Sequence, residues 1–251
     1  MLNVTDVSVR FGKNEVVSKL SFSVEEGQWL MLCGPNGAGK STLVNAIAQT
    51  IPYSGKISWK NENLSRMSSR EIARRIGVLS QHNSTGYDFR VEEVVALGRY
   101  VHTKGILNRN NDDTAARVEN ALGLCDLKDF AKRSILTLSG GELQRVFLAQ
   151  VFAQDPALLI LDEPANHLDM PYQKQLFELI AAWVAQPGKA VISVVHDLSL
   201  AKRYGSHALL MNHGKNFGFG PVSDVLTGEN LNSVYGMDIQ KWMQEMYRQW
   251  K

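Results

Sequence analysis

Short apolar runs separated by helix-like segments constrain the fold of this chain more than any other feature. The runs are uniformly apolar rather than alternating, as strands covered on both faces are. They are Trp29–Cys33, Ile76–Leu79, Leu158–Leu161, Ala190–Val195 and Ala208–Met211. Helical patterns lie between them, for example over Ser41–Gln49 and Tyr172–Val184. Strands that alternate with helices predict an α/β fold around a mostly parallel sheet.

Two parts of the chain depart from this alternation. Leu2–Val9 and Leu20–Val24 alternate apolar and polar residues, which predicts half-exposed antiparallel strands. Roughly residues 82–155 lack a strand-like run and carry helical patterns instead, such as Val91–Leu97. We therefore expect one domain over residues 1–251, with an N-terminal antiparallel β subdomain and a helical subdomain inserted into the α/β core.

The composition is that of a globular protein. Of the 251 residues, 44% are hydrophobic and 21% are charged, and the net charge of +2 does not suggest a nucleic-acid partner. Cys33 and Cys125 show neither a pairing motif nor metal-ligand spacing, so we expect buried, reduced thiols.

No secretory signal is expected at the N-terminus. A bilayer span needs about 20 mostly apolar residues, and charged residues and prolines interrupt every apolar run before that length. Any connection to a membrane is therefore expected to be made through a partner.

The segment Gly34–Ser41 matches the pattern G-x-x-x-x-G-K-[ST] and lies between an apolar strand and a helical run. Its glycines let successive backbone N–H groups point at phosphates. Lys40 supplies a positive charge for the β- and γ-phosphates, and Ser41 offers a hydroxyl to Mg²⁺. A glycine-rich turn that binds nothing is the alternative, but the lysine, the hydroxyl and the context argue against it. We call this segment the phosphate cradle. Alone, it does not distinguish kinases, GTPases, ATPases and motor proteins.

Polar residues follow three of the apolar runs. Asp162 ends one run and can hold Mg²⁺, while Glu163 can orient and polarise water that attacks a γ-phosphate. The alternative for Asp162 is a helix cap before Pro164. Gln81 and His196 follow two other runs, at the strand ends where ligands bind in open α/β sheets.

A second anion-binding helix start is predicted at Ser139-Gly140-Gly141-Glu142. Serine followed three residues later by glutamate is a capping box. A well-capped helix alone does not explain two glycines at the first helical positions, because glycine lowers helix stability there. Glycine is suited to a backbone that comes close to an anion. Since the cradle already surrounds one face of a nucleotide, we expect this helix start to cover a nucleotide held by a second copy, in a head-to-tail dimer.

Together these segments closely resemble the ATP-binding cassette of ABC transporters, over nearly the whole chain. The signature segment, Leu138–Gln144, is the diagnostic element. The resemblance implies a P-loop NTPase (RecA-like) fold with ATP and Mg²⁺ as cofactors, Glu163, His196 and Lys40 as catalytic residues, and Ser41, Gln81 and Asp162 as metal contacts. It implies nucleotide contacts from Phe11, Gly34, Pro35, Asn36, Gly37, Ala38, Gly39, Lys40, Ser41, Thr42, Gln81, Ser139, Gly140, Gly141, Glu142 and Asp169.

Some of these roles come from the resemblance alone. Phe11 matches the aromatic residue that stacks on adenine; the alternative is a core aromatic. Gln81 matches the residue that touches Mg²⁺ and senses the transmembrane partner. Asn166–Asp169 matches the loop that crosses the dimer interface, and His196 the histidine that contacts the γ-phosphate.

Within the family, the segments around Gly98, Asn166 and His196 are most similar to importers of iron-siderophores, haem or cobalamin. This subgroup implies a homodimer of cassettes on the cytoplasmic face of the inner membrane, held by integral permease subunits and served indirectly by an external binding protein. No nucleic acid is expected. Molybdate- or zinc-type importers, exporters, soluble non-transport ABC ATPases and non-catalytic regulatory modules remain alternatives.

Overall fold

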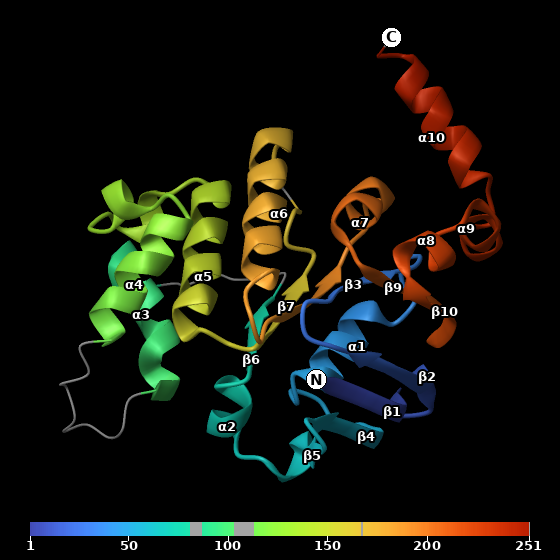
Figure 1. The fold of residues 1–251 in the computed structure, drawn as a ribbon, viewed down its shortest axis with the longest axis horizontal. Helices are drawn as coiled ribbons and strands as arrows, with labels where there is room; N and C mark the ends of the chain where they lie inside the picture. Colours follow the sequence, from blue (N-terminus) through green and yellow to red (C-terminus); the bar gives the residue numbers. More distant parts are fainter. Residues whose placement is uncertain (81–86, 103–112, 167, 251) are drawn as a thin grey trace. The chain divides into compact units, whose positions relative to one another are not determined.

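The computed structural model describes residues 1–80, 87–102, 113–166 and 168–250. The chain divides into two compact units, each described by itself below (Figure 1). The first unit consists of Met1–Arg66 and Ile192–Lys251, and the second consists of Met67–Val191.

An antiparallel sheet forms the N-terminal part of the first unit. Its strands follow the order β2-β1-β4-β5, with bounds β1 Leu2–Phe11, β2 Asn14–Val24, β4 Ser54–Trp59 and β5 Glu62–Asn63. Leu2 of β1 pairs with Val24 on one side and with Trp59 on the other. The antiparallel prediction is confirmed, and both predicted strands extend to the hairpin between Phe11 and Asn14.

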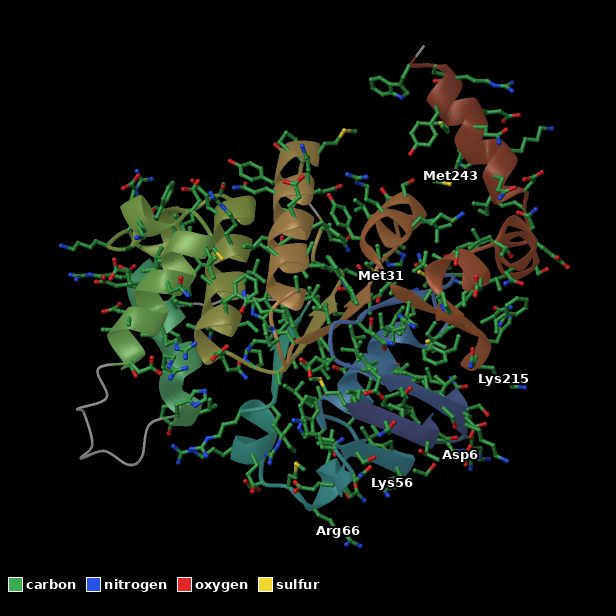
Figure 2. The ribbon with its side chains drawn as sticks, viewed as in Figure 1. Asp6, Met31, Lys56, Arg66, Lys215 and Met243 are labelled. Atoms are coloured by element: carbon green, nitrogen blue, oxygen red, sulfur yellow. The ribbon has the colours of Figure 1, made fainter. Side chains whose placement is uncertain are left out.

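A second group of strands in the first unit carries the cradle. β3 (Trp29–Cys33) pairs in parallel with β9 (His207–Asn212), which pairs antiparallel with β10 (Lys215–Pro221). Every residue of β3 is buried, as its uniform apolarity predicted. Figure 2 marks fully buried Met31 on this strand, whereas Lys56 and Lys215 are exposed. The helices of this unit include α1 Lys40–Ile47, α7 Leu198–Tyr204, α8 Val222–Val225, α9 Gly228–Tyr235 and α10 Ile239–Arg248, with the 3₁₀ turn η1 Leu64–Arg66.

The second unit holds two parallel strands and most of the longer helices. β6 (Ile76–Leu79) pairs in parallel with β7 (Leu158–Asp162). The strand β8 (Ala190–Val194) lies where the two units divide in the sequence. The helices include α2 Ser69–Ala73, α3 Val91–Leu97, α4 Asp113–Leu124, α5 Gly140–Gln154 and α6 Met170–Val184, with 3₁₀ turns η2 Gly98–His102, η3 Lys128–Phe130 and η4 Ile135–Thr137. The described residues between 87 and 154 form helices and one isolated bridge, Arg90 to Ser134. The limits of a separate helical subdomain stay a prediction.

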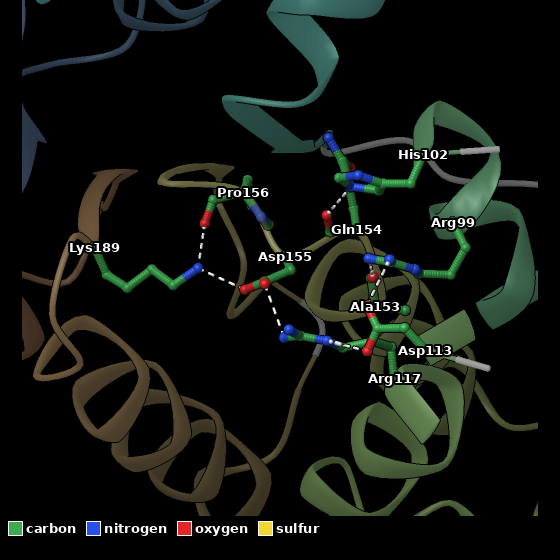
Figure 3. A network of polar contacts seen from close by, with 9 residues as sticks. All are labelled: Arg99, His102, Asp113, Arg117, Ala153, Gln154, Asp155, Pro156 and Lys189. Carbon is green, nitrogen blue, oxygen red and sulfur yellow. Dashed lines mark hydrogen bonds and ion pairs between the residues drawn. The ribbon is translucent and has the colours of Figure 1, made fainter. Parts of the chain in front are cut away.

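Polar and charged side chains bind the carbonyl groups and the Asp155 carboxylate at the C-terminal end of α5 (Figure 3). Arg99 donates to the Ala153 carbonyl at 2.9 Å, and His102 Nε2 lies 2.8 Å from the Gln154 carbonyl oxygen. Asp155 ends the helix in the left-handed region and lies between Arg117, at 2.8 Å, and Lys189, at 2.6 Å. The network therefore links α5 to η2, to α4 and to the segment that precedes β8.

We predict that Asp155→Asn lowers the free energy of unfolding by about 1–2 kcal/mol. Asparagine tolerates the left-handed backbone, but it leaves Lys189, whose side chain is only 12% exposed, without its carboxylate. Urea denaturation measures the effect, with exposed Asp129→Asn as the control. Equal stability of the two variants would contradict this role of Asp155.

Candidate functional site

The phosphate cradle is held against β9 by backbone contacts that only glycine permits. Gly34 has φ 142°, and a Cβ atom there would stand 2.2 Å from the carbonyl oxygen of Met211. Gly39 has φ 94°, and its Cβ would stand 2.8 Å from the carbonyl oxygen of Val16. Gly214, in the β9–β10 turn, donates to the carbonyl of Ala38 at 3.1 Å. The glycines of the motif are therefore required by the fold of the loop itself.

Lys40 begins α1 and holds its ammonium group within the cradle. The Nζ atom donates to the carbonyls of Gly34 at 2.8 Å and Pro35 at 3.0 Å, and the residue is only 5% exposed. The first turn of α1 contains no acidic residue, so no carboxylate there opposes an anion at this helix start. Ser41 follows directly on the same turn. This arrangement places a positive charge, a hydroxyl and a helix N-terminus where a phosphate group would bind.

The two cysteines are free and buried, as predicted. Burial raises the pKa of the Cys33 thiol to about 12 even though nearby Lys40 lowers it. Burial likewise raises the pKa of the Cys125 thiol to about 12, against the opposing effect of Arg145. Cys33 precedes the cradle and packs in β3, and neither thiol is poised to react.

His196 and Phe11 belong to the same unit as the cradle. Val195 donates its N–H to the carbonyl of Leu32 at 3.2 Å, so His196 emerges beside the strand that leads into Gly34. His196 is exposed and precedes Asp197, the N-cap of α7. Phe11 ends β1 and is 55% exposed, which excludes the core-aromatic alternative. Its exposed ring is available for stacking.

Asp162, one of the predicted metal contacts, and Glu163, the predicted base, lie in the second unit. Asp162 is the last residue of β7 and is 8% exposed; the helix-cap alternative is wrong, because α6 begins only at Met170, with Asp169 as its N-cap. Glu163 follows with φ 55°, in the left-handed region that a glutamate seldom adopts. The side-chain amide of Asn166 donates to Glu163 Oε2. The carboxyl group is thus oriented by a neighbour on its own loop.

The start of α5 has the capping box that the sequence predicted. The Ser139 N–H donates to Glu142 Oε2 at 2.7 Å, and Ser139 Oγ accepts from the Glu142 N–H at 3.3 Å. The bond from the Ser139 N–H and, to a smaller extent, a bond from the Ser139 hydroxyl lower the pKa of the Glu142 carboxyl. The Glu142 carboxylate is therefore occupied within its own helix, and its contact with nucleotide stays a prediction.

Gly140 is not required by the packing of its own chain. It begins α5, and a Cβ atom built on it would meet no atom of the described residues within 4 Å. Gly141 is more closely covered, with a Leu168 methyl group 3.3 Å from its Cβ position. The absence of a side chain at Gly140 thus leaves the exposed helix start open to a group from outside the chain.

The sequence-predicted residues fall into two groups. The first unit holds Phe11, the cradle, Lys40, Ser41 and His196, and the second holds the α5 start, Asp162, Glu163 and Asp169. Gln81 and His167 lie outside the described residues. Two contacts were missed: Asn166 to Glu163, and the Gln144 side chain to the Pro164 carbonyl. No sequence signal pointed to the second contact, because it depends on how α5 packs against the β7–α6 loop.

Comparison with known proteins identifies relatives of this chain along nearly its whole length. Residues 17–166 match the family model described as ABC transporter. The chain is 40% identical over 245 residues to the hemin import ATP-binding protein HmuV of Pseudomonas entomophila, covering 95% of this chain and 94% of that protein. It is 35% identical to the ferric enterobactin transport ATP-binding protein FepC of Escherichia coli, covering 92% and 85%. It is 30% identical to the petrobactin import ATP-binding protein YclP of Bacillus subtilis, covering 95% and 94%.

Solved structures confirm the predicted α/β P-loop NTPase fold. A metal-chelate type ABC transporter in an inward-facing conformation matches with a TM-score of 0.82 at 25% identity, over 94% of this chain and 89% of that chain. A dimeric post-hydrolysis state of the cassette MJ0796, bound to ADP and Pi, matches in fold with a TM-score of 0.77 at 23% identity, over 88% and 99%.

We predict that Gly34→Ala lowers the free energy of unfolding by about 3 kcal/mol or more and abolishes ATP binding, because the methyl group would collide with the Met211 carbonyl. Gly37→Ala is the matched control. Gly37 also has a positive φ, 79°, but a Cβ atom there would meet no described atom within 4 Å. We therefore expect Gly37→Ala to lower the free energy of unfolding by only about 1–2 kcal/mol. Thermal unfolding and nucleotide titration measure both. Equal losses of stability and ATP binding in the two variants would show that the close contact between Gly34 and β9 does not stabilise the cradle.

Proposed function

Because the chain belongs to the ABC transporter family of ATP-binding proteins, we propose that it is the ATPase subunit of an importer for an iron-siderophore, haem or cobalamin-like substrate. ATP hydrolysis coupled to transport is the activity of this family. The observation that carries the import assignment is near full-length likeness to proteins named for the import of hemin and petrobactin and for the transport of ferric enterobactin. The chain spans almost the whole of the hemin protein, so the likeness is not confined to one motif.

The donor set fits a magnesium ion that accompanies ATP. Ser41 offers a hydroxyl and Asp162 a carboxylate, and Mg²⁺ is held in proteins by one or two such oxygens together with substrate phosphates and water. Gln81 is the third residue to which we assign this role. Bound Mg²⁺ would neutralise charge on the β- and γ-phosphates.

Each catalytic residue is assigned a separate task. Lys40 binds the β- and γ-phosphates with a positive charge that is already held within the cradle. Glu163 orients the attacking water and accepts its proton at a carboxylate oxygen, and Asn166 fixes the direction of that carboxylate. His196 contacts the γ-phosphate, and Phe11 stacks on the adenine ring.

The chain is proposed to act as a homodimer. Each α5 start, with Ser139, Gly140 and Gly141, would cover a nucleotide bound to the cradle of the other copy. Gly140 supports this proposal, because a Cβ atom there would meet none of the described residues of its own chain within 4 Å. A two-fold axis would make both nucleotide sites equivalent.

Membrane attachment is proposed to occur through partners. Among the described residues, no helix combines the length and the apolar character needed to cross a bilayer. We assign the chain to the cytoplasmic face of the cell membrane, bound to integral permease subunits that an external binding protein supplies with substrate. Residues 81–102 are the candidate docking segment. In the described part of it, Tyr87 and Tyr100 are 74% and 77% exposed.

We predict that Glu163→Gln lowers kcat for ATP by at least about 100-fold and traps a dimer with ATP bound, because the amide cannot accept the proton from water. Phosphate release and size-exclusion chromatography in Mg·ATP measure the two effects. Glu178→Gln, an exposed substitution on α6, is the control. Hydrolysis at the wild-type rate would show that Glu163 is not the base.

We predict that cells lacking the gene lose energy-dependent uptake of a labelled ferric siderophore, haem or cobalamin. Wild-type protein should restore that uptake and Glu163→Gln should not. Molybdate and zinc uptake serve as the comparison in the same cells. Loss of molybdate or zinc uptake, with uptake of the three proposed substrates intact, would reject the substrate class while leaving the ATPase assignment in place.

A further inference from the structure

The described residues of the loop between β7 and α6, 163–166 and 168–169, are held by side-chain amides on both neighbouring helices of the second unit. Gln144, in the second turn of α5, donates its amide to the carbonyl of Pro164. Gln173, in the first turns of α6, donates to the carbonyl of Leu168 at 2.9 Å and to that of Ala165 at 3.4 Å. The loop that carries Glu163 is therefore tied to both helices.

The face of α5 that touches this loop begins at the signature segment. Gly141 and Gln144 are three residues apart and lie on one side of the helix. Leu168 of the loop covers Gly141, and Gln144 reaches Pro164. Both residues also line a small, largely apolar pocket together with Arg145, Leu148 and Tyr172. The first turns of α5 and the loop therefore pack directly on one another.

Glu163 depends on its surroundings for its conformation. Its φ of 55° is unfavourable for a side chain with a Cβ atom, so neighbouring contacts must hold it. The next residue, Pro164, has a φ angle fixed by its ring. The Gln144 amide binds the carbonyl that directly follows this restricted pair. Movement of α5 would therefore act on the Pro164–Ala165 peptide, which Pro164 alone separates from Glu163.

We propose that Gln144 is a positioning residue that links the α5 start to the orientation of Glu163 in the same chain. The inference rests on the proposed function, in which Glu163 is the base and the α5 start covers the partner copy's nucleotide. Contact of Ser139–Gly141 with one ATP is then transmitted through Gln144 to the base that hydrolyses the other. Gln173 supports the same loop from α6.

The test compares Gln144→Leu, which removes the amide and keeps a strong helix former, with Gln244→Leu, a matched change at an exposed position of α10. Gln144→Leu should lower kcat about ten- to hundredfold, because the base is misplaced. It should leave the KM for ATP within about twofold of wild type, because no cradle residue is touched. Hydrogen exchange should become faster at the amides of the 163–169 loop and stay unchanged in β7. Gln244→Leu should change none of these. If Gln144→Leu does not fold, Gln144→Met replaces it.

A double mutant decides whether Gln144 acts through Glu163. In the Glu163→Gln background, Gln144→Leu should cause no further loss of single-turnover hydrolysis, because the group that it positions is already disabled. A further loss as large as in the wild-type background would overturn the proposal. So would a wild-type kcat for Gln144→Leu, or unchanged exchange in the loop. If Glu163→Gln alone hydrolyses ATP normally, the proposed function fails instead, and the two failures are distinguishable.

Discussion

The close approach between the Gly34 backbone and the Met211 carbonyl oxygen determines where the phosphate cradle lies. A 2.2 Å separation from a virtual Cβ leaves no room for any side chain at Gly34. It fixes the strand-to-helix turn against β9, and the Gly214 N–H secures the same loop at Ala38. Lys40 is then placed by its position as the first residue of α1 and by its hydrogen bonds to the Gly34 and Pro35 carbonyls. The chemistry of the cradle depends on this backbone packing.

The starts of α1 and α5, the two helix starts for which we propose anion binding, are built in different ways. At α1, Gly39 stands at the N-cap position in the left-handed region, and none of the described side chains caps the helix there. At α5, the Ser139–Glu142 box satisfies the helix start within the chain, while Gly140 removes the side chain that would screen it. The α1 start therefore lies within a glycine-rich loop, whereas the α5 start is capped by its own side chains and carries no side chain at Gly140.

The apolar runs predicted strands well, because a strand buried on both faces consists of consecutive apolar residues. That pattern can be recognised without knowing which elements pack against the strand. β3 and β6 have the predicted bounds, and β7 extends by the one residue, Asp162, that completes its end. The capping box of α5 was equally readable, since its partners are three residues apart. The left-handed backbone of Glu163 and the Gln144 contact were not, because both depend on how α5 and the β7–α6 loop meet in space. The division of the chain into two units within β8 could not be predicted either, because the composition does not change at that point.

The buried state of the two thiols makes the native chain suitable for site-directed labelling. Because burial raises the pKa of both thiols to about 12, little thiolate is present near neutral pH. Maleimide reagents should therefore not react with Cys33 or Cys125. A single cysteine introduced on an exposed helix would then be the only reactive sulfur. Distances between two labelled copies could be followed by spin or fluorescence probes without first removing the natural residues.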